Sequence, residues 1–219
     1  MSTQAVTHLP PTPPSEPAKM TGTVLPPSSA PLQPAHKHIW LITGPAGCGK
    51  TSVAEFLRQS LSVPYLEGDT FHTPENVKKM GEGTPLTDAD RWDWLILLRE
   101  EALRTLASSP DLNGVVLTCS ALKRKYRDVF RVATYHNPGL RVHFVFLNVS
   151  EAILMDRVRA RQNHYMKDYM VRSQFQSLEA PQQDETDVLS VEASGASVEV
   201  QKLALAVVNE AMEKDSKPV

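Results

Sequence analysis

Hydrophobic and polar positions follow two alternating patterns from residue 38 onward. Short continuous apolar runs, rich in β-branched residues, alternate with longer stretches in which apolar residues recur every three or four positions. The first pattern is typical of buried parallel strands, and the second of helices that cover a sheet. The expected strands are 38–43, 63–67, 114–119, 141–147 and 187–192. The expected helices are 50–61, 88–107, 120–136, 150–161 and 197–213, with Ser120 and Ser150 as caps of the third and fourth.

This alternation predicts one α/β domain over residues 36–219, with a parallel sheet covered by helices. Residues 1–35 differ in composition, because they contain nine prolines and few large apolar side chains. Such a segment cannot bury enough surface to offset the entropy lost on ordering. We therefore expect a disordered, proline-rich tail that precedes the folded domain.

Charge and cysteine content narrow the classes of function. The net charge is −2 with both signs interspersed, which gives no electrostatic reason to expect a nucleic-acid or membrane partner. No run of 18 apolar residues is present, and the first residues resemble neither a signal peptide nor a mitochondrial presequence. Cys48 and Cys119 do not suggest a disulfide framework, so a reducing cytoplasm is expected.

A phosphate-binding loop stands between the first expected strand and the first expected helix. It reads Gly44, Pro45, Ala46, Gly47, Cys48, Gly49, Lys50 and Thr51, and fits the pattern G-x-x-x-x-G-K-[ST]. Glycines let the backbone wrap a phosphate, and the helix start directs N–H groups at it. Lys50 is expected to reach the β- and γ-phosphates of a bound nucleotide, and the Thr51 hydroxyl to hold Mg²⁺. The alternative is a glycine turn with an incidental lysine.

The type of P-loop protein is narrowed by motifs that the chain lacks. The only D-x-x-G precedes a strand, no N-K-x-D is present, and no acidic residue ends an apolar strand, so a GTPase is not indicated. Asp69 follows the second expected strand, where a carboxylate can accept a hydroxyl proton or orient Mg²⁺. The alternative is that Glu67 and Asp69 are turn residues around Gly68.

Two groups of cations are candidates for anion binding. Lys123, Arg124 and Arg127 lie in the first turns of the expected helix 120–136, where cations are disfavoured unless an anion is near. Arg124 and Arg127 share a face and could grip one anion, although a solvated basic face is the alternative. Arg157 and Arg161 end another expected helix and could lie over a nucleotide, or be snorkelling surface arginines.

Several ordered motifs together resemble the gluconate kinase (gluconokinase) family of P-loop sugar-acid kinases. Besides the loop, they are Gly68 to His72 (G-D-x-[LF]-H), Asn76 to Arg91 (N-x-x-K-M-x-x-G-x-P-L-x-D-x-D-R), Cys119 to Asp128 (C-S-A-L-K-R-x-Y-R-D), Arg161 to Met166 and Ser173 to Pro181. The resemblance covers most of residues 38–186. Glu67, Asp93 and Tyr165 depart from the family pattern, where aspartate, proline and phenylalanine are usual.

The resemblance implies a P-loop kinase fold: a three-layer α/β/α domain with a five-stranded parallel sheet and a mobile lid at about 157–185. It implies transfer of the ATP γ-phosphoryl group to the 6-hydroxyl of D-gluconate, with Mg²⁺, in a homodimer. The implied catalytic residues are Lys50, Asp69 and Arg124. The implied substrate ligands are Asp69, His72, Lys79, Arg91, Lys123, Arg124 and Arg127. The nucleotide ligands are the loop 44–51, Arg157 and Arg161, and the metal ligands are Thr51 and, as a second candidate, Asp69.

Other functions stay open from the residues alone. A kinase for another small hydroxy acid or for a nucleoside monophosphate would use the same loop and an anion-binding pair of arginines. A P-loop binding or regulatory protein that has lost turnover is a second class. The intact Lys50 and Asp69 count against that class, because a protein without turnover has no need of both.

Overall fold

A parallel five-stranded sheet forms the middle layer of the domain. The structure, a computed structural model, describes residues 36–160 and 168–216. The strands are β1 (Lys37–Thr43), β2 (Tyr65–Leu66), β3 (Gly114–Thr118), β4 (Leu140–Asn148) and β5 (Val188–Glu192), in the order β2-β3-β1-β4-β5. All four pairings are parallel, which confirms the predicted fold class. The expected tail, residues 1–35, lies outside the described residues.

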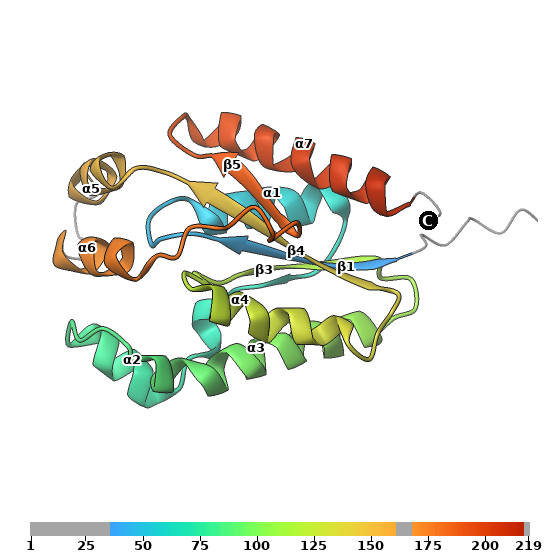
Figure 1. The fold of residues 1–219 in the computed structure, drawn as a ribbon, viewed down its shortest axis with the longest axis horizontal. Helices are drawn as coiled ribbons and strands as arrows, with labels where there is room; N and C mark the ends of the chain where they lie inside the picture. Colours follow the sequence, from blue (N-terminus) through green and yellow to red (C-terminus); the bar gives the residue numbers. More distant parts are fainter. Residues whose placement is uncertain (1–35, 161–167, 217–219) are drawn as a thin grey trace, which may run out of the picture. The chain divides into compact units, whose positions relative to one another are not determined.

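Helices cover both faces of this sheet (Figure 1). On one face lie α1 (Lys50–Leu61) and α7 (Ser197–Asp215), and on the other lie α3 (Asp88–Ala107) and α4 (Arg124–Arg131). The central strand β1 alternates between the two cores: Trp40 and Ile42 pack with the first pair of helices, Ile39 and Leu41 with the second. All four side chains are almost fully buried, which explains the continuous apolar run.

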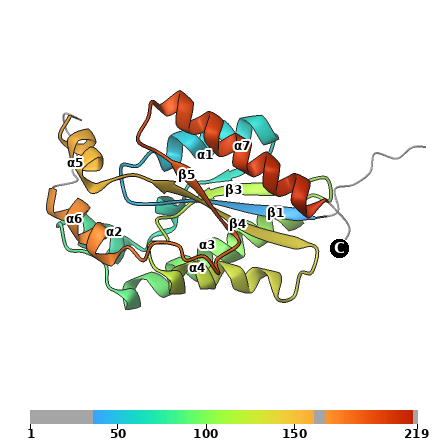
Figure 2. The same ribbon diagram turned by 45° about the horizontal axis from the view of Figure 1, so that its top comes forward.

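Three further helices lie near the carboxyl ends of the strands (Figures 1 and 2). They are α2 (Pro74–Gly81), α5 (Glu151–Ala160) and α6 (Asp168–Ser177). Short 3₁₀ turns span Gly68–Phe71 and Val132–Thr134. In the parts of the chain that the structure describes, no helix is both long and apolar enough to cross a bilayer.

Several expected elements differ from those observed. Helix α4 begins at Arg124 rather than at residue 120, and Ser120 does not cap it, because Ala121 adopts a left-handed φ of 40° and turns the chain first. Ser150 does accept a bond from the Ile153 N–H, at 3.4 Å. Helices α2, of 8 residues, and α6, of 10 residues, were not expected. Strand β2 is shorter than the predicted 63–67, because Pro64 before it has no N–H to donate and the 3₁₀ turn Gly68–Phe71 follows directly after Glu67.

Candidate active site

The glycine-rich loop joins the carboxyl end of the central strand β1 to helix α1. Gly44 has a φ of 134°, and a Cβ there would lie 2.9 Å from the Cys48 Sγ and 3.0 Å from the Leu147 carbonyl oxygen, so the turn requires glycine. The Lys50 ammonium donates to the carbonyl oxygens of Gly44 and Pro45, each at 3.1 Å. Its charge is thus held over the loop, at the amino end of α1 where phosphate binds.

Two cavities lie beside the loop. The first, about 150 Å³, is named here the Asp69 cavity, and its polar and charged lining residues are Lys50, Asp69, His72, Arg91, Ser120, Ser173, Gln174 and Ser177. The second, about 370 Å³, is named the Arg157 cavity, and its lining includes Gly47, Gly49, Ser52, Arg157, Gly195 and Ser197. Lys50 lines the first cavity and loop glycines line the second. The loop therefore lies between two cavities, each of which could hold a ligand.

Asp69 is positioned by a close approach between Gly68 and strand β3. A Cβ on Gly68 would lie 1.9 Å from the Thr118 carbonyl oxygen, so no other residue fits without moving the backbone. The Gly68 N–H donates to the Thr118 hydroxyl at 3.1 Å, and the Trp94 indole N–H donates to the Gly68 carbonyl at 2.8 Å. These contacts fix the turn that carries the Asp69 carboxylate into the cavity.

His72 lies in the same cavity, where its surroundings favour the neutral imidazole. Its ring stacks on Trp94 with centroids 4.0 Å apart. Burial lowers the pKa of His72 and the Arg91 charge lowers it further, while Asp69 acts in the opposite direction. Its Nδ1 is buried and has no partner among the described residues. A neutral imidazole has one nitrogen that donates a hydrogen bond and one that accepts, so it can pair with a hydroxyl group in either sense.

Glu67, which the sequence offered as an alternative turn residue and as a departure from the family pattern, contacts the loop. Its carboxylate accepts hydrogen bonds from the hydroxyls of Thr51, at 3.2 Å, and of Thr118 and Tyr65. Burial alone would raise the pKa of Glu67, but these donors outweigh it and the pKa is lowered. A charged carboxylate beside the Thr51 hydroxyl forms the hard oxygen set that suits Mg²⁺. The contact with Thr51 is made by Glu67 and not by Asp69.

The Arg157 cavity involves a loop that sequence reasoning missed. The Arg157 guanidinium donates to the carbonyl oxygens of Ser194 and Gly195, at 2.9 and 3.1 Å. This loop joins β5 to α7, and its only sequence signal is a Ser-Gly turn between a strand and a helix. Arg157 therefore lines the second cavity, and its role as a nucleotide ligand stays a prediction. Arg161 and the motif 161–166 lie outside the described residues.

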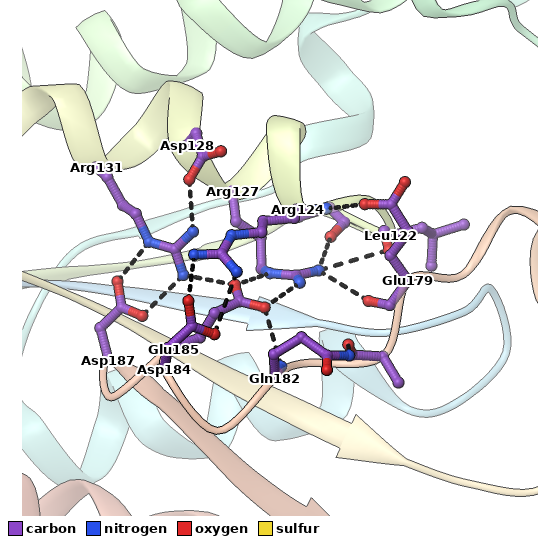
Figure 3. Close-up of polar contacts among 12 residues, drawn as sticks. Leu122, Arg124, Arg127, Asp128, Arg131, Glu179, Gln182, Asp184, Glu185 and Asp187 are labelled. Carbon is purple, nitrogen blue, oxygen red and sulfur yellow. Dashed lines mark hydrogen bonds and ion pairs between the residues drawn. The ribbon is translucent and has the colours of Figure 1, made fainter.

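The expected anion-binding arginines of α4 are instead paired with acidic side chains (Figure 3). Arg127 is 1% exposed, and its guanidinium makes a two-point contact with the Glu185 carboxylate at 2.7 and 2.6 Å. The Arg127 pairing holds the pKa of Glu185 at about 2. Arg124 pairs with Asp184 at 3.1 and 2.8 Å. Neither arginine lines the Asp69 cavity.

The anion expected at the start of α4 is supplied by the chain itself. The Glu179 carboxylate accepts the Arg124 backbone N–H at 2.7 Å (Figure 3). An acidic group at a helix amino end is favourable, and it accounts for the cations that follow. Two other expected substrate ligands are also paired outside the cavity: Lys123 with Asp88 at 2.9 Å, and Lys79 with Asp90 at 2.6 Å.

The described structure therefore separates the expected substrate ligands into two sets. Asp69, His72 and Arg91 line one cavity with Lys50. Their sequence separation gave no direct sign of this, but each follows or precedes a turn at the carboxyl end of the sheet. The other set consists of Lys79, Lys123, Arg124 and Arg127, whose ion pairs tie helices and loops together. Arg124 and Arg127 resembled a binding site in the sequence because their acidic partners, Asp184 and Glu185, lie 60 and 58 residues away.

Comparison with known proteins agrees with this geometry. A family model described as an AAA domain matches residues 39–182. A Schizosaccharomyces pombe protein named "Probable gluconokinase" is 38% identical over 91% of this chain and 100% of its own length. The "Thermoresistant gluconokinase" of Escherichia coli is 37% identical over 71% of this chain and 84% of its own. The chain belongs to the gluconokinase family.

A solved gluconokinase structure has the same fold. The crystal structure of a gluconokinase from Sinorhizobium meliloti aligns with a TM-score of 0.69 and 37% identity, over 83% of this chain and 96% of that one. The AAA domain match contains the phosphate loop and all the residues of the Asp69 cavity named above. Strand β5 and helix α7 lie beyond its end, so the Ser194–Gly195 contact falls outside that match.

Proposed function

We propose that this chain is a gluconokinase that transfers the γ-phosphoryl group of ATP to the 6-hydroxyl of D-gluconate, giving 6-phospho-D-gluconate and ADP. The observation that carries the proposal is the loop between two cavities, one with Asp69 and a cation, the other bordered by loop glycines. A phosphoryl transfer needs a donor and an acceptor on opposite sides of the transferring group. Membership of the gluconokinase family supports gluconate as the acceptor.

The Arg157 cavity is proposed to take the nucleoside of ATP. Its lining combines Gly47 and Gly49 with the Ser197 end of α7 and the apolar Val53 and Val200. Apolar and backbone groups of this kind suit a purine base, and the Arg157 guanidinium can stack on it. Arg161, in the part of the chain that the structure does not describe, stays a predicted nucleotide ligand.

The Asp69 cavity is proposed to take gluconate. Arg91 lines it, and its guanidinium lies close to the Leu86 carbonyl and 3.0 Å from the Thr87 carbonyl, which holds the arginine in place. We assign to Arg91 the gluconate carboxylate, and to His72 and Asp69 its hydroxyls. This replaces Arg124 and Arg127 as the acid anchor, because those two are already neutralised by carboxylates.

The residues around the loop are proposed to share the chemical work. Asp69 accepts the proton of the gluconate 6-hydroxyl. At the same time the hydroxyl oxygen bonds to the γ-phosphorus and the bond between that phosphorus and ADP breaks. Lys50 stabilises the charge on the phosphate oxygens, which can replace the loop carbonyls as its acceptors. Thr51, with Glu67 beside it, would hold Mg²⁺, which supplies further positive charge to the β- and γ-phosphates.

A panel of acceptors tests the proposal. ADP formation is measured with D-gluconate, D-glucose, a second sugar acid and AMP, and the phosphorylated carbon is located by NMR. Gluconate should have the highest kcat/KM, with phosphate on C6. Glucose lacks the carboxylate, so its kcat/KM should be at least about 10-fold lower, given about 1.5–3 kcal/mol for a hydrogen bond to a charged group. Preference for AMP or for glucose would reject gluconate as the acceptor.

Arg91→Met sharpens this test, because it removes the proposed carboxylate ligand and keeps most of the side-chain volume. It should lower kcat/KM for gluconate and leave that for glucose almost unchanged. Its melting temperature is the control for the contacts of Arg91 with Leu86 and Thr87. An equal loss for both acceptors would place the carboxylate elsewhere.

The homodimer, the cytoplasmic location and the lid at 157–185 stay predictions. Light scattering measures the molar mass in solution and so tests the homodimer.

A further inference from the structure

A glutamine on helix α6 is bonded directly to the phosphate loop. The Gln174 side-chain oxygen Oε1 accepts the backbone N–H of Ala46 at 2.7 Å, although the two residues are 128 positions apart. Ala46 belongs to the phosphate loop and lines the Asp69 cavity. Gln174, on helix α6, lines the same cavity. This contact lies outside the expected site residues, because Gln174 belongs to a helix that the sequence pattern did not predict.

The Ala46 contact fixes the orientation of the Gln174 amide. A backbone N–H can only donate, so the oxygen of the amide must face the loop, and the nitrogen Nε2 must face away from it. Ser173, Gln174 and Ser177 all line the Asp69 cavity, so this side of α6 borders the space that also contains Lys50 and Asp69. The two N–H groups of Nε2 therefore belong to a side chain that is anchored at one end and lines the cavity.

Gln174 shares its cavity with the two residues that are proposed to act on the phosphoryl group. Lys50, the cation proposed to bind the γ-phosphate of ATP, lines this cavity together with Gln174, and so does Asp69, the proposed proton acceptor of the hydroxyl. A group in transit carries charge on its equatorial oxygens, and fixed N–H donors stabilise that charge without reorganising. A neutral amide adds such a donor without adding a further charge that would need its own partner.

We propose that Gln174 is a catalytic residue whose Oε1 holds the Ala46 N–H while its Nε2 donates to an equatorial oxygen of the transferring phosphoryl group. This rests on the proposed function, since it assumes that phosphoryl transfer occurs in the Asp69 cavity. The amide thereby links the geometry of the loop to the position of the donor: as long as the loop is correctly shaped, Nε2 is correctly placed.

Gln174→Glu separates the two ends of the amide. The carboxylate keeps the shape and can still accept the Ala46 N–H, but it offers no donor to the phosphoryl group. We expect kcat with gluconate to fall by about 10²–10³-fold, as for loss of one donor to a developing charge. The KM values and the melting temperature should stay close to those of the parent. Gln174→Ala removes the loop contact as well, so its melting temperature should also fall.

Gln176→Glu is the matched control. Gln176 lies two residues after Gln174 on α6 and its side chain is exposed, and its replacement by glutamate makes the same change of charge. Its kinetics should equal those of the parent, because charges exposed to solvent are screened. Unchanged kcat in Gln174→Glu would overturn the proposal. An equal fall in both variants would also overturn it, since the effect would then not depend on a side chain that lines the cavity.

A binding measurement keeps this proposal separate from the identity of the acceptor. ADP with aluminium fluoride imitates the phosphoryl group in transit and requires no gluconate. Gln174→Glu should lose about 10²-fold in affinity for ADP with aluminium fluoride and little for ADP alone. If the parent fails to phosphorylate gluconate but this difference is seen, the proposed function fails and the role of Gln174 stands. Equal losses for the two ligands would overturn that role.

Discussion

Single residues at this site are defined by what their neighbours leave possible. Asp69 reaches its cavity because Gly68 packs against Thr118 more closely than any side chain allows. Gln174 has a defined amide orientation because its partner can only donate. Arg127 looks like an anion-binding residue in the sequence, but its buried guanidinium is matched by the Glu185 carboxylate. Residue type thus sets the possible chemistry, and the neighbours select which part of it is used.

The Asp69 carboxylate gives the first prediction at this scale. Asp69→Asn keeps the shape but cannot accept the hydroxyl proton, so kcat should fall by about 10²–10⁴-fold. The KM for ATP should change little, because the nucleotide is assigned to the other side of the loop. Steady-state kinetics with the melting temperature as control checks this. Near-normal kcat would reduce Asp69 to a turn residue.

At the scale of elements, a group of ion pairs ties helix α4 to the segment that leads into β5 (Figure 3). Besides the Arg127–Glu185 pair, Arg131 contacts Glu185 and Asp187, at 2.7 Å each. The segment follows α6, which carries Gln174, and the Arg124 N–H binds Glu179 within it. These contacts therefore help to fix where α6 ends relative to the sheet, and with it the placement of the amide on the loop.

Breaking the buried pair gives the prediction for this scale. Glu185→Ala leaves the Arg127 charge buried without its partner, which should lower the free energy of unfolding by about 3–5 kcal/mol. Asp184→Ala is the matched control, because the Arg124–Asp184 pair is largely exposed and should contribute at most about 1 kcal/mol. Urea unfolding of both variants measures the difference. Similar losses would show that burial does not decide the value of these pairs.

At the scale of the whole domain, a histidine cluster lies at the end of the sheet away from the phosphate loop. His38 and His143 stack against Trp40, with ring centroids 5.0 and 4.6 Å from it. The Asp215 carboxylate, at the end of α7, lies 2.9 Å from the His143 Nε2. Burial, followed by the charge of His143, lowers the pKa of His38 to about 4, and burial lowers that of His143. Asp215 only partly opposes both shifts.

This cluster makes stability depend on pH. Above pH 6.5, the ordinary pKa of histidine, His38 is neutral in both the folded and the unfolded chain. As the pH falls from 6.5 toward 4, only the unfolded chain takes up the proton, so stability is lost over that window. The loss from His38 should be about 3 kcal/mol. Urea unfolding at pH 7.5 and 4.5 should show a smaller loss in His38→Leu, whereas the exposed His136→Gln should behave as the parent.

Local patterns in the sequence were enough to determine the fold class, the phosphate loop and the family. A short, continuous apolar run such as 38–43 is typical of a strand that is buried on both faces. The loop motif places its glycines, Lys50 and Thr51 within eight residues. These features depend on short-range spacing and backbone geometry, which a sequence displays directly. The same holds for α1 and α3, whose bounds agree with the predicted ones.

The tertiary structure alone decided which charged residues line a cavity and which are paired. Arg91 and Arg127 look alike in sequence, yet Arg91 lines the Asp69 cavity while Arg127 meets Glu185, 58 residues further along the chain. Gln174 came to the loop from 128 residues away, on a short helix that the pattern did not predict. Long-range pairing depends on where the sheet order and the helices bring distant segments together. Burial and complementary charge then determine whether an arginine lines a cavity or forms an ion pair within the protein.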